Sequence, residues 1–135
     1  MAARDLAQLL DALSPTLDET RYGFACIQAE QIPASLVAVA LGSFREAEGI
    51  TVIAPVAALN KAHVSVDGEY TCITLSVHSS LAAVGLTARV TTVLADAGIS
   101  ANVVAAFYHD HIFVPAEHAL RAMTVLQDLS SNHRD

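Results

Sequence analysis

The 135-residue chain has no tryptophan, few basic residues and no long apolar run. Its seven lysines and arginines stand apart from one another, and fourteen acids give a formal net charge of -7. Such a surface repels phosphate backbones, so we expect no binding to nucleic acid. No apolar run reaches the roughly 20 residues that span a bilayer, and the first residues lack the uninterrupted apolar stretch of a signal peptide. We therefore expect a cytoplasmic protein without a membrane anchor.

The sequence is also poor in groups that carry catalysis. Cys26 and Cys72 lie in apolar, strand-like runs without C-x-x-C spacing, which favours two reduced core thiols over a disulfide or redox pair. There is no G-x-S-x-G elbow, P-loop or G-x-G-x-x-G motif. Acid pairs such as Asp18 and Glu19 are expected in loops, where charges are ordinarily solvated. We expect neither an enzyme nor a bound cofactor.

What the chain does have is apolar residues, 53% of the total, in patterns typical of short helices and strands. In the first half these patterns predict a helix over residues 3–13 and a strand over 22–28. They also predict a short strand over 50–53 and a helix over 56–62, directly after Pro55. Residues 36–44 fit either a buried strand or a helix, because valine and alanine alternate there.

The second half has a clearer order. Residues 70–77 alternate as a strand, 85–97 keep helical spacing up to Gly98, and two strands over 99–107 and 112–114 precede a helix that opens at Pro115. Strand, helix, strand, strand, helix is the α+β, ferredoxin-like plan: an antiparallel sheet with helices on one face. One strand is missing, and residues 22–28 are the best candidate to supply it. The sequence therefore predicts two interlocked halves.

The segment VGLTARV at 84–90, followed by VLADAGIS at 93–100, resembles an ACT domain. In that pattern a loop ending in Gly-Leu enters an amphipathic helix, and Leu-Ala-x-Ala-Gly-Ile leads into the second strand. The runs ITLSVHSSLAAVGLTA, GISANVVAAFYHDHIFVP and LLDALSPTL are similar to a small bacterial family of paired ACT domains of unassigned function. The resemblance implies a βαββαβ fold in two ACT-like halves, a degenerate one over residues 1–66 and a second over 67–135.

The resemblance also implies a function. ACT domains generally occur in pairs, bind amino acids where two of them meet and report to a partner, so we expect a non-catalytic regulatory homodimer. The ligand is held by the loop before the first helix and by the facing second strand. Carried onto this sequence, the candidate ligand-binding residues are His78, Ser79, Ser80, Val84, Gly85, Leu86, Thr87, Ala101, Asn102 and Val103.

The residue types at these positions fit a small polar ligand. A loop that enters a helix offers unpaired backbone N–H groups to a carboxylate, and Gly85 lets the backbone approach closely. Asn102 has both donors and acceptors. Structural roles remain open for each: a tight turn for Gly85, caps for Ser79 and Ser80, and pairing with sheet-edge backbone for Asn102.

The string His109-Asp110-His111 is open to three interpretations. Asp110 caps a hairpin turn while both imidazoles bond the backbone, or the histidines serve a ligand site or subunit interface, or they supply two ligands of a metal. A metal would need a third ligand, and the candidates have no recognised spacing: His63, His78 and Glu117. We expect no metal and keep His109 and His111 as a minor alternative.

A different class of function also fits the pattern. A ferredoxin-like sheet leaves its second strand, here residues 99–107, at an edge, where an apolar strand invites pairing with another chain. The alternative to a sensor is thus an interaction module that pairs through sheet edges without a ligand.

Overall fold

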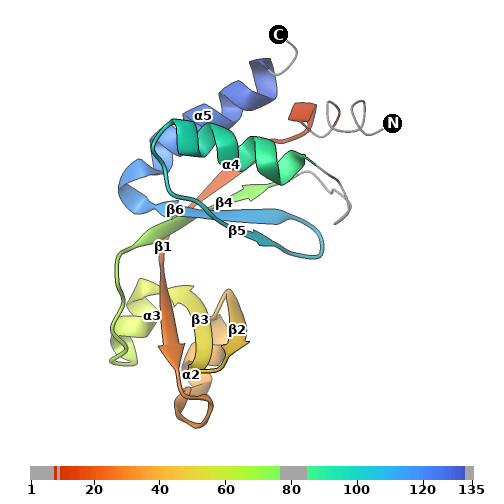
Figure 1. Ribbon diagram of the computed structural model, residues 1–135. Coiled ribbons are helices and arrows are strands. Elements are labelled where there is room, and N and C mark those ends of the chain that lie inside the picture. Colours follow the sequence, from red (N-terminus) through yellow and green to blue (C-terminus); the bar gives the residue numbers. More distant parts are fainter. Residues whose placement is uncertain (1–7, 9, 77–84, 133–135) are drawn as a thin grey trace. The chain divides into compact units, whose positions relative to one another are not determined.

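The computed structural model describes residues 8, 10–76 and 85–132 (Figure 1). The chain forms two compact units. The terminal unit comprises Met1–Glu19 and Thr71–Asp135, and the central unit comprises Thr20–Tyr70. None of the helices in the described ranges is long and apolar enough to cross a membrane.

The terminal unit has the strand-helix-strand-strand-helix order that the sequence predicts. Its elements are β4 (Tyr70–Leu75), α4 (Leu86–Asp96), β5 (Asn102–Ala105), β6 (Asp110–Pro115), the 3-10 turn η2 (Ala116–His118) and α5 (Ala119–Asn132). The strand predicted over 99–107 is shorter than expected, because the residues before Asn102 form the turn out of α4. The strand after it starts earlier, at Asp110, and contains His111.

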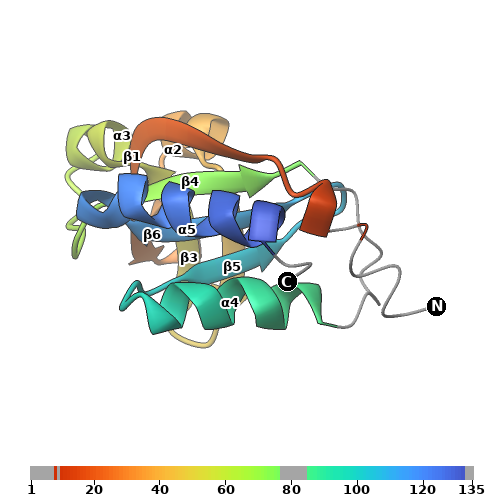
Figure 2. The ribbon, with the colours of Figure 1, turned by 90° about the horizontal axis from the view of Figure 1, so that it is seen from above.

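Helices α4 and α5 lie side by side on one face of the terminal unit's strands (Figure 2). Leu86, Val90 and Leu94 of α4 follow helical spacing and are buried. They pack with Ile73 and Leu75 of β4 and with further buried residues of α5 and β6. This helix face therefore holds the core of the terminal unit. Of the helix predicted over 3–13, residues 8, 10 and 11 are helical, and residues 1–7 and 9 lie outside the described residues.

The central unit repeats the same order of strands and α-helices with shorter helices. Its elements are β1 (Pro15–Ile27), the 3-10 turn η1 (Ala29–Gln31), α2 (Ala34–Val39), β2 (Gly42–Glu46), β3 (Gly49–Pro55) and α3 (Val56–Lys61). The ambiguous run 36–44 is thus a helix end followed by a strand. A Cβ added to Gly23 of β1 would come within 2.8 Å of Val66 Cγ1 and 3.0 Å of Leu59 Cδ1, so glycine lets the chain pack closely there.

Strand β1 starts seven residues before the position predicted from the apolar pattern. Residues Thr16 and Asp18 to Arg21 are exposed, and so carry no apolar alternation for a sequence pattern to detect. Backbone pairing holds them in a strand, since β1 neighbours β4 in the sheet. Asp18 and Glu19 are therefore strand residues, and their placement in a loop was wrong.

The order of the strands is β2-β3-β1-β4-β6-β5. In the N-terminal half, β2, β3 and β1 lie next to one another, and β4 follows β1 as a fourth strand. In the C-terminal half, β5, β6 and β4 lie next to one another, and β1 follows β4 as a fourth strand. Each half thus takes its fourth strand from the other, which confirms the interlocked ferredoxin-like plan. Tyr22–Ile27 pair with β3, whereas Pro15–Glu19 belong to the terminal unit.

Candidate functional site

The described part of the candidate ligand site lies at the start of α4 and the start of β5. Four of the sequence-predicted residues lie outside the described residues: His78, Ser79, Ser80 and Val84. The others follow directly in the chain or belong to β5 and the residue before it.

Gly85 is the residue that precedes α4. Its backbone has φ 100° and ψ -21°, in the left-handed region, and no side chain caps the helix start. The helix begins with a hydrogen bond from the N–H of Arg89 to the carbonyl of Gly85, at 2.9 Å. Residues with a Cβ are strained at this φ, so the backbone turn alone already explains glycine here.

The remaining predicted residues divide into core and surface positions. Leu86 is buried in the core of the terminal unit, and Ala101 and Val103 pack partly buried against that core. The Leu86 side chain is therefore closed to a ligand, whereas those of Ala101 and Val103 keep some exposed surface. Thr87 and Asn102 have exposed side chains, and the Thr87 carbonyl accepts a hydrogen bond from the Thr91 hydroxyl at 2.9 Å.

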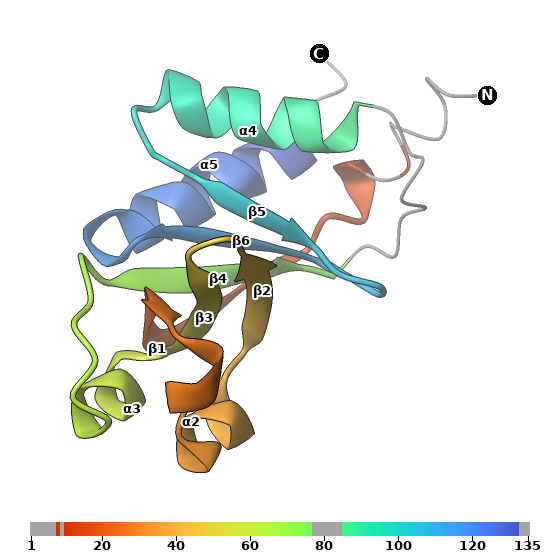
Figure 3. The same ribbon diagram turned by 60° about the horizontal axis from the view of Figure 1, so that its bottom comes forward.

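The directions of α4 and β5 decide which of these residues come together. The helix and the strand run in opposite directions (Figure 3), so the end of α4 that starts at Leu86 lies toward the C-terminal end of β5. Asn102 is the first residue of β5 and lies at the other end. Within one chain the structure therefore places the Gly85 end of α4 and Asn102 at opposite ends of the strand.

The face of the sheet away from α4 and α5 carries a polar cluster that the sequence analysis missed. Ile73 and Ile112 belong to the core on the helix side, so alternation puts Thr74 and His111 on the other side. The His111 Nδ1 atom lies 3.0 Å from the Thr74 hydroxyl oxygen. The alternation of residues in β4 indicated the face on which Thr74 lies. The sequence did not show how β6 aligns with β4, so it could not predict the contact between Thr74 and His111.

The pKa shifts of His111 and of the neighbouring Cys72 favour the neutral form of each side chain. Burial lowers the pKa of His111, the nearby His109 lowers it further, and Asp110 opposes the change. Burial raises the pKa of the Cys72 thiol to about 11, with a smaller contribution from Asp18 in the same direction and an opposing hydrogen bond with the Thr74 side chain. Cys72 is a reduced core thiol, as predicted, whereas Cys26 is exposed and its assignment to the core was wrong.

The histidine string contributes to the β5–β6 hairpin. The carbonyl of His109 accepts a hydrogen bond from the N–H of Ala106 at 3.0 Å, and Asp110 begins β6 with only 9% of its surface exposed. The Nδ1 atom of His109 is buried and has no hydrogen-bond partner among the residues described. Over the same residues, no group of three or more His, Cys, Asp and Glu side chains is placed to hold a metal. His109 and His111 thus lack a third ligand there.

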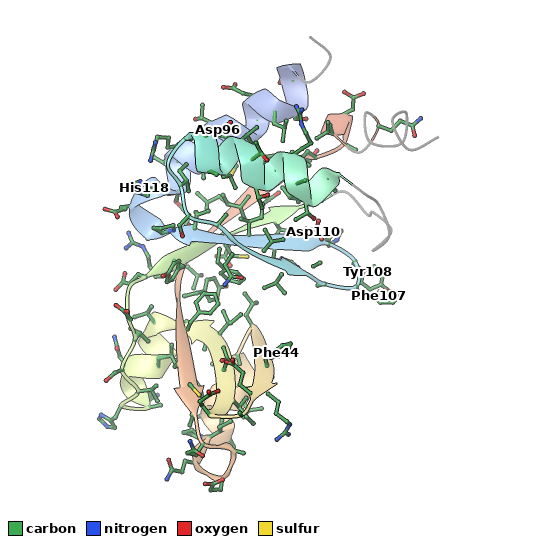
Figure 4. The ribbon with its side chains drawn as sticks, viewed as in Figure 1. Phe44, Asp96, Phe107, Tyr108, Asp110 and His118 are labelled. Carbon is green, nitrogen blue, oxygen red and sulfur yellow. The ribbon has the colours of Figure 1, made fainter. Side chains whose placement is uncertain are left out.

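Exposed aromatic rings mark the tip of the same hairpin. Phe107 is 78% exposed and Tyr108 66%, and their rings meet edge to face with centroids 5.0 Å apart (Figure 4). Val104, on the edge strand β5, is 37% exposed. These side chains give the β5 edge an apolar character.

A shallow groove with a volume of about 560 Å³ lies in the central unit, between α2 and α3. It has apolar walls and one lysine, and is lined by Pro33, Ser35, Leu36, Val39, Ala58, Lys61 and Ala62. It contains none of the predicted site residues.

Comparison with known proteins gives two family matches and several similar structures. ACT domain profiles match residues 67–128 and residues 2–82. No curated protein matches. A crystal structure of a Vibrio cholerae protein of unknown function, described as a possible transport protein, is 37% identical with a TM-score of 0.84, covering 96% of this chain and 99% of that one.

Two more distant structures share the fold. An Agrobacterium tumefaciens protein is 21% identical with a TM-score of 0.71, covering 86% of this chain and 87% of its own. The ligand-free regulatory subunit of aspartate kinase from Thermus thermophilus is 11% identical with a TM-score of 0.63, covering 87% of this chain and 98% of its own.

Proposed function

The chain belongs to the ACT domain family, and from this we propose that it is a non-catalytic, cytoplasmic regulatory protein that binds an amino acid. We assign the two ACT domains to residues 1–66 and 67–135. The match over residues 67–128 begins at this boundary, whereas the match over residues 2–82 extends past it. The regulatory subunit of aspartate kinase, which has the same fold, gives the regulatory role a precedent.

The observation that carries the site is the opposite direction of α4 and β5 (Figure 3). When two copies pair antiparallel through their β5 edges, Asn102 of one copy approaches the C-terminal end of β5 in the other. The Gly85 end of the other copy's α4 lies toward that end. The site is therefore completed only in a homodimer, with the helix start from one chain and Asn102 from the other.

The chemistry at both parts suits an α-amino acid. The backbone N–H groups of Leu86 and Thr87 have no partner within the helix, because they belong to its first turn, and they would bind the carboxylate. The Asn102 side-chain oxygen would accept from the ammonium group. His78, Ser79, Ser80 and Val84 complete the loop in this proposal. A ligand bound in this way joins two chains and shifts their association equilibrium.

A thermal-shift screen against the twenty amino acids, with the mass of each complex measured in solution, tests this function. One or a few amino acids should raise the melting temperature, because a ligand at a hundredfold excess over its Kd stabilises the native state by about 2.7 kcal/mol. The same amino acids should increase the mass of the particle. A flat panel, with no change in temperature or mass, would refute amino-acid binding.

A pair of glycine variants distinguishes an effect on ligand binding from an effect on backbone strain. Gly85→Ala and Gly98→Ala both place a Cβ at positive φ, 100° and 74°, at the two ends of α4. A Cβ on Gly98 meets nothing within 4 Å, so this variant reports strain alone. We expect both variants to lose similar stability, but only Gly85→Ala and Asn102→Ala to lose ligand affinity, by about tenfold or more. Equal affinity in all three variants would place the ligand elsewhere.

A second candidate function is pairing through the β5 edge without any ligand. The exposure of Val104, Phe107 and Tyr108 along this edge and its hairpin favours it. It predicts an association that Phe107→Ser weakens and that no amino acid changes. Association that appears only with an amino acid would favour the sensor instead.

A further inference from the structure

The groove between α2 and α3 is built on the core of the central unit. Leu36 of α2 and Leu59 of α3 are buried in one cluster with residues of β1 and β3, so both helices cover the same face of these strands. Leu36 also forms part of the groove's wall. The groove's volume of about 560 Å³ lies within the range of about 300–1,000 Å³ that is typical of small-molecule sites. It is therefore large enough to hold a small ligand.

The lining of the groove combines apolar side chains with a single charge. Its five apolar residues are prolines, alanines or branched aliphatic residues, and its two polar ones are Ser35 and Lys61. None of the described residues that line it is acidic, although the chain as a whole has a net charge of -7. The charge in the groove is thus opposite in sign to that of the protein. This composition suits an apolar ligand that has one negative charge.

Lys61 is the only lysine in the sequence, and it lies exposed in the last turn of α3. Its ammonium group forms no ion pair or hydrogen bond with the residues that the structure describes. Other basic residues are engaged: Arg21 pairs with Glu69 at 3.0 Å, and Arg121 donates to the Ala97 carbonyl. The charge of Lys61 is therefore available to a ligand in the groove.

We propose that this groove binds an aliphatic carboxylate, with the carboxylate against the Lys61 ammonium group and the chain against Leu36, Val39 and Ala58. An exposed ion pair contributes little by itself, so contact of the chain with the apolar wall supplies much of the affinity. Full burial of a methylene strengthens binding about fourfold, and an open groove gives about twofold. The ammonium group of an amino acid has no anionic partner in this lining, so the site favours acids without an amino group.

Side-chain directions on α2 provide a matched pair of variants. Val37 is 61% exposed and Val39 is 49% exposed, but Val39 lines the groove and Val37 is not among its lining residues. Two positions along a helix correspond to a rotation of about 200°, so the two side chains point to different sides. A glutamate at position 39 therefore places a negative charge in the groove, whereas a glutamate at position 37 does not.

Calorimetric titration of the full chain with octanoate tests the proposal. We expect saturable binding at one site per chain, weakened about tenfold or more in Lys61→Gln and lost in Val39→Glu. Val37→Glu and Arg45→Gln change the net charge by the same amount outside the groove and should bind like the wild type. No binding to the wild type, unchanged affinity in Lys61→Gln or equal losses in Val39→Glu and Val37→Glu would overturn the proposal. If Val39→Glu fails to fold, Val39→Ser should still weaken binding.

Two analogues separate the contributions of the charge and of the chain. Octan-1-ol keeps the chain without the charge, and butanoate keeps the charge with four fewer methylenes. Each should bind about tenfold or more weakly than octanoate, since about twofold per methylene accumulates over four of them. Equal binding of octan-1-ol and octanoate would reduce the site to non-specific apolar contact and refute a role for Lys61.

The signal of the single lysine reports the contact directly. Reductive methylation with ¹³C-formaldehyde labels Lys61 and keeps its charge, and the labelled lysine signal is identified by its absence in Lys61→Gln. Octanoate should shift this signal in a saturable manner, with the same Kd as in calorimetry. A constant signal during saturable binding would place the carboxylate elsewhere. A lysine that only stabilises the end of α3 through the helix dipole would change the melting temperature of Lys61→Gln but not its affinity for octanoate.

This site is independent of the proposed amino-acid site, and the two fail separately. Asn102→Ala should lose affinity for the amino acid and keep octanoate binding, whereas Lys61→Gln should do the reverse. A response to octanoate with a flat amino-acid panel would refute the sensor and support the groove. A response to an amino acid without any binding of octanoate would refute the groove alone.

Discussion

The terminal and central units share an order of elements but differ in the size of their helices. α4 and α5 have 11 and 14 residues, whereas α2 and α3 have 6 each. Longer helices bury a continuous stripe, as α4 does through Leu86, Val90 and Leu94. The short α2 buries only Leu36 and leaves Val37 and Val39 exposed.

This difference indicates that the two units have different local stabilities although they share one topology. Isolated helices of six residues are unstable in water, so α2 and α3 depend entirely on packing. The central unit is therefore the part in which local opening should be easiest. The terminal unit has the larger core and carries the candidate ligand site.

The largest difference in free energy of unfolding between the two units is expected from truncating one buried leucine in each. Leu94 is 0% exposed in the terminal core and Leu36 is 1% exposed in the central core. We expect Leu94→Ala to cost about 4 kcal/mol and Leu36→Ala about 2 kcal/mol, toward the two ends of the range for buried leucine. Fewer buried neighbours around Leu36 mean less contact to lose. Urea unfolding measures both, and equal or reversed costs would contradict the comparison.

The two cysteines report the same contrast chemically. Cys26 of the central unit is exposed and Cys72 of the terminal unit is buried, with its pKa raised to about 11. The thiolate is the reactive form and Cys72 is buried, so at pH 8 a thiol reagent should modify Cys72 more slowly than the exposed Cys26, by about tenfold or more. The Cys26→Ser variant should lose the fast phase, and Cys72→Ser should keep it. Two fast phases in the native protein would show that Cys72 on β4 becomes accessible readily.

Hydrogen exchange should rank the units by local stability. We expect backbone amides of α2, α3 and β2 to exchange about tenfold faster than those of α4, α5 and β6, because the shorter helices open without unfolding the larger core. Leu36→Ala should accelerate exchange in the central unit alone. Acceleration spread evenly over both units would mean that they open together.

The sequence predicted the elements of the terminal unit better than those of the central unit for the same physical reason. Long helices with a repeated apolar stripe, such as α4, are visible in one dimension. The start of β1 is not, since Thr16 and most of the residues up to Arg21 are exposed and only pairing with β4 makes them a strand. The interlocked plan was predicted by counting strands, and the resemblance to ACT domains implied the βαββαβ fold of each half.

The candidate site was predictable only in part. Glycine at the start of α4 is a local signal, and the structure explains it by its positive φ. The separation of Asn102 from that end of the helix depends on the direction of β5, and the pairing of Thr74 with His111 depends on the alignment of β4 with β6. Neither long-range relation leaves a trace in the spacing of residues along the chain.

The smallest expected effect is a pH dependence confined to the terminal unit. The pKa of His111 is lowered in the folded state, chiefly by burial. Above the unfolded value of about 6.5 the imidazole is neutral in both states and contributes nothing. As the pH falls through this value the unfolded chain binds the proton first, so the free energy of unfolding decreases until the folded pKa is passed.

Comparison of the wild type with His111→Gln between pH 7.5 and pH 5 isolates this contribution. The wild type should lose more stability than the variant on acidification, and the His111 resonance should titrate below the usual range of a histidine. His109→Ala should raise the His111 pKa, because it removes a neighbouring group that lowers it. Exchange of amides in β4 and β6 should respond to this pH change more than exchange in α2 and α3, because His111 and its partner Thr74 both belong to the terminal unit. A larger response in the central unit would assign the acid sensitivity to other groups.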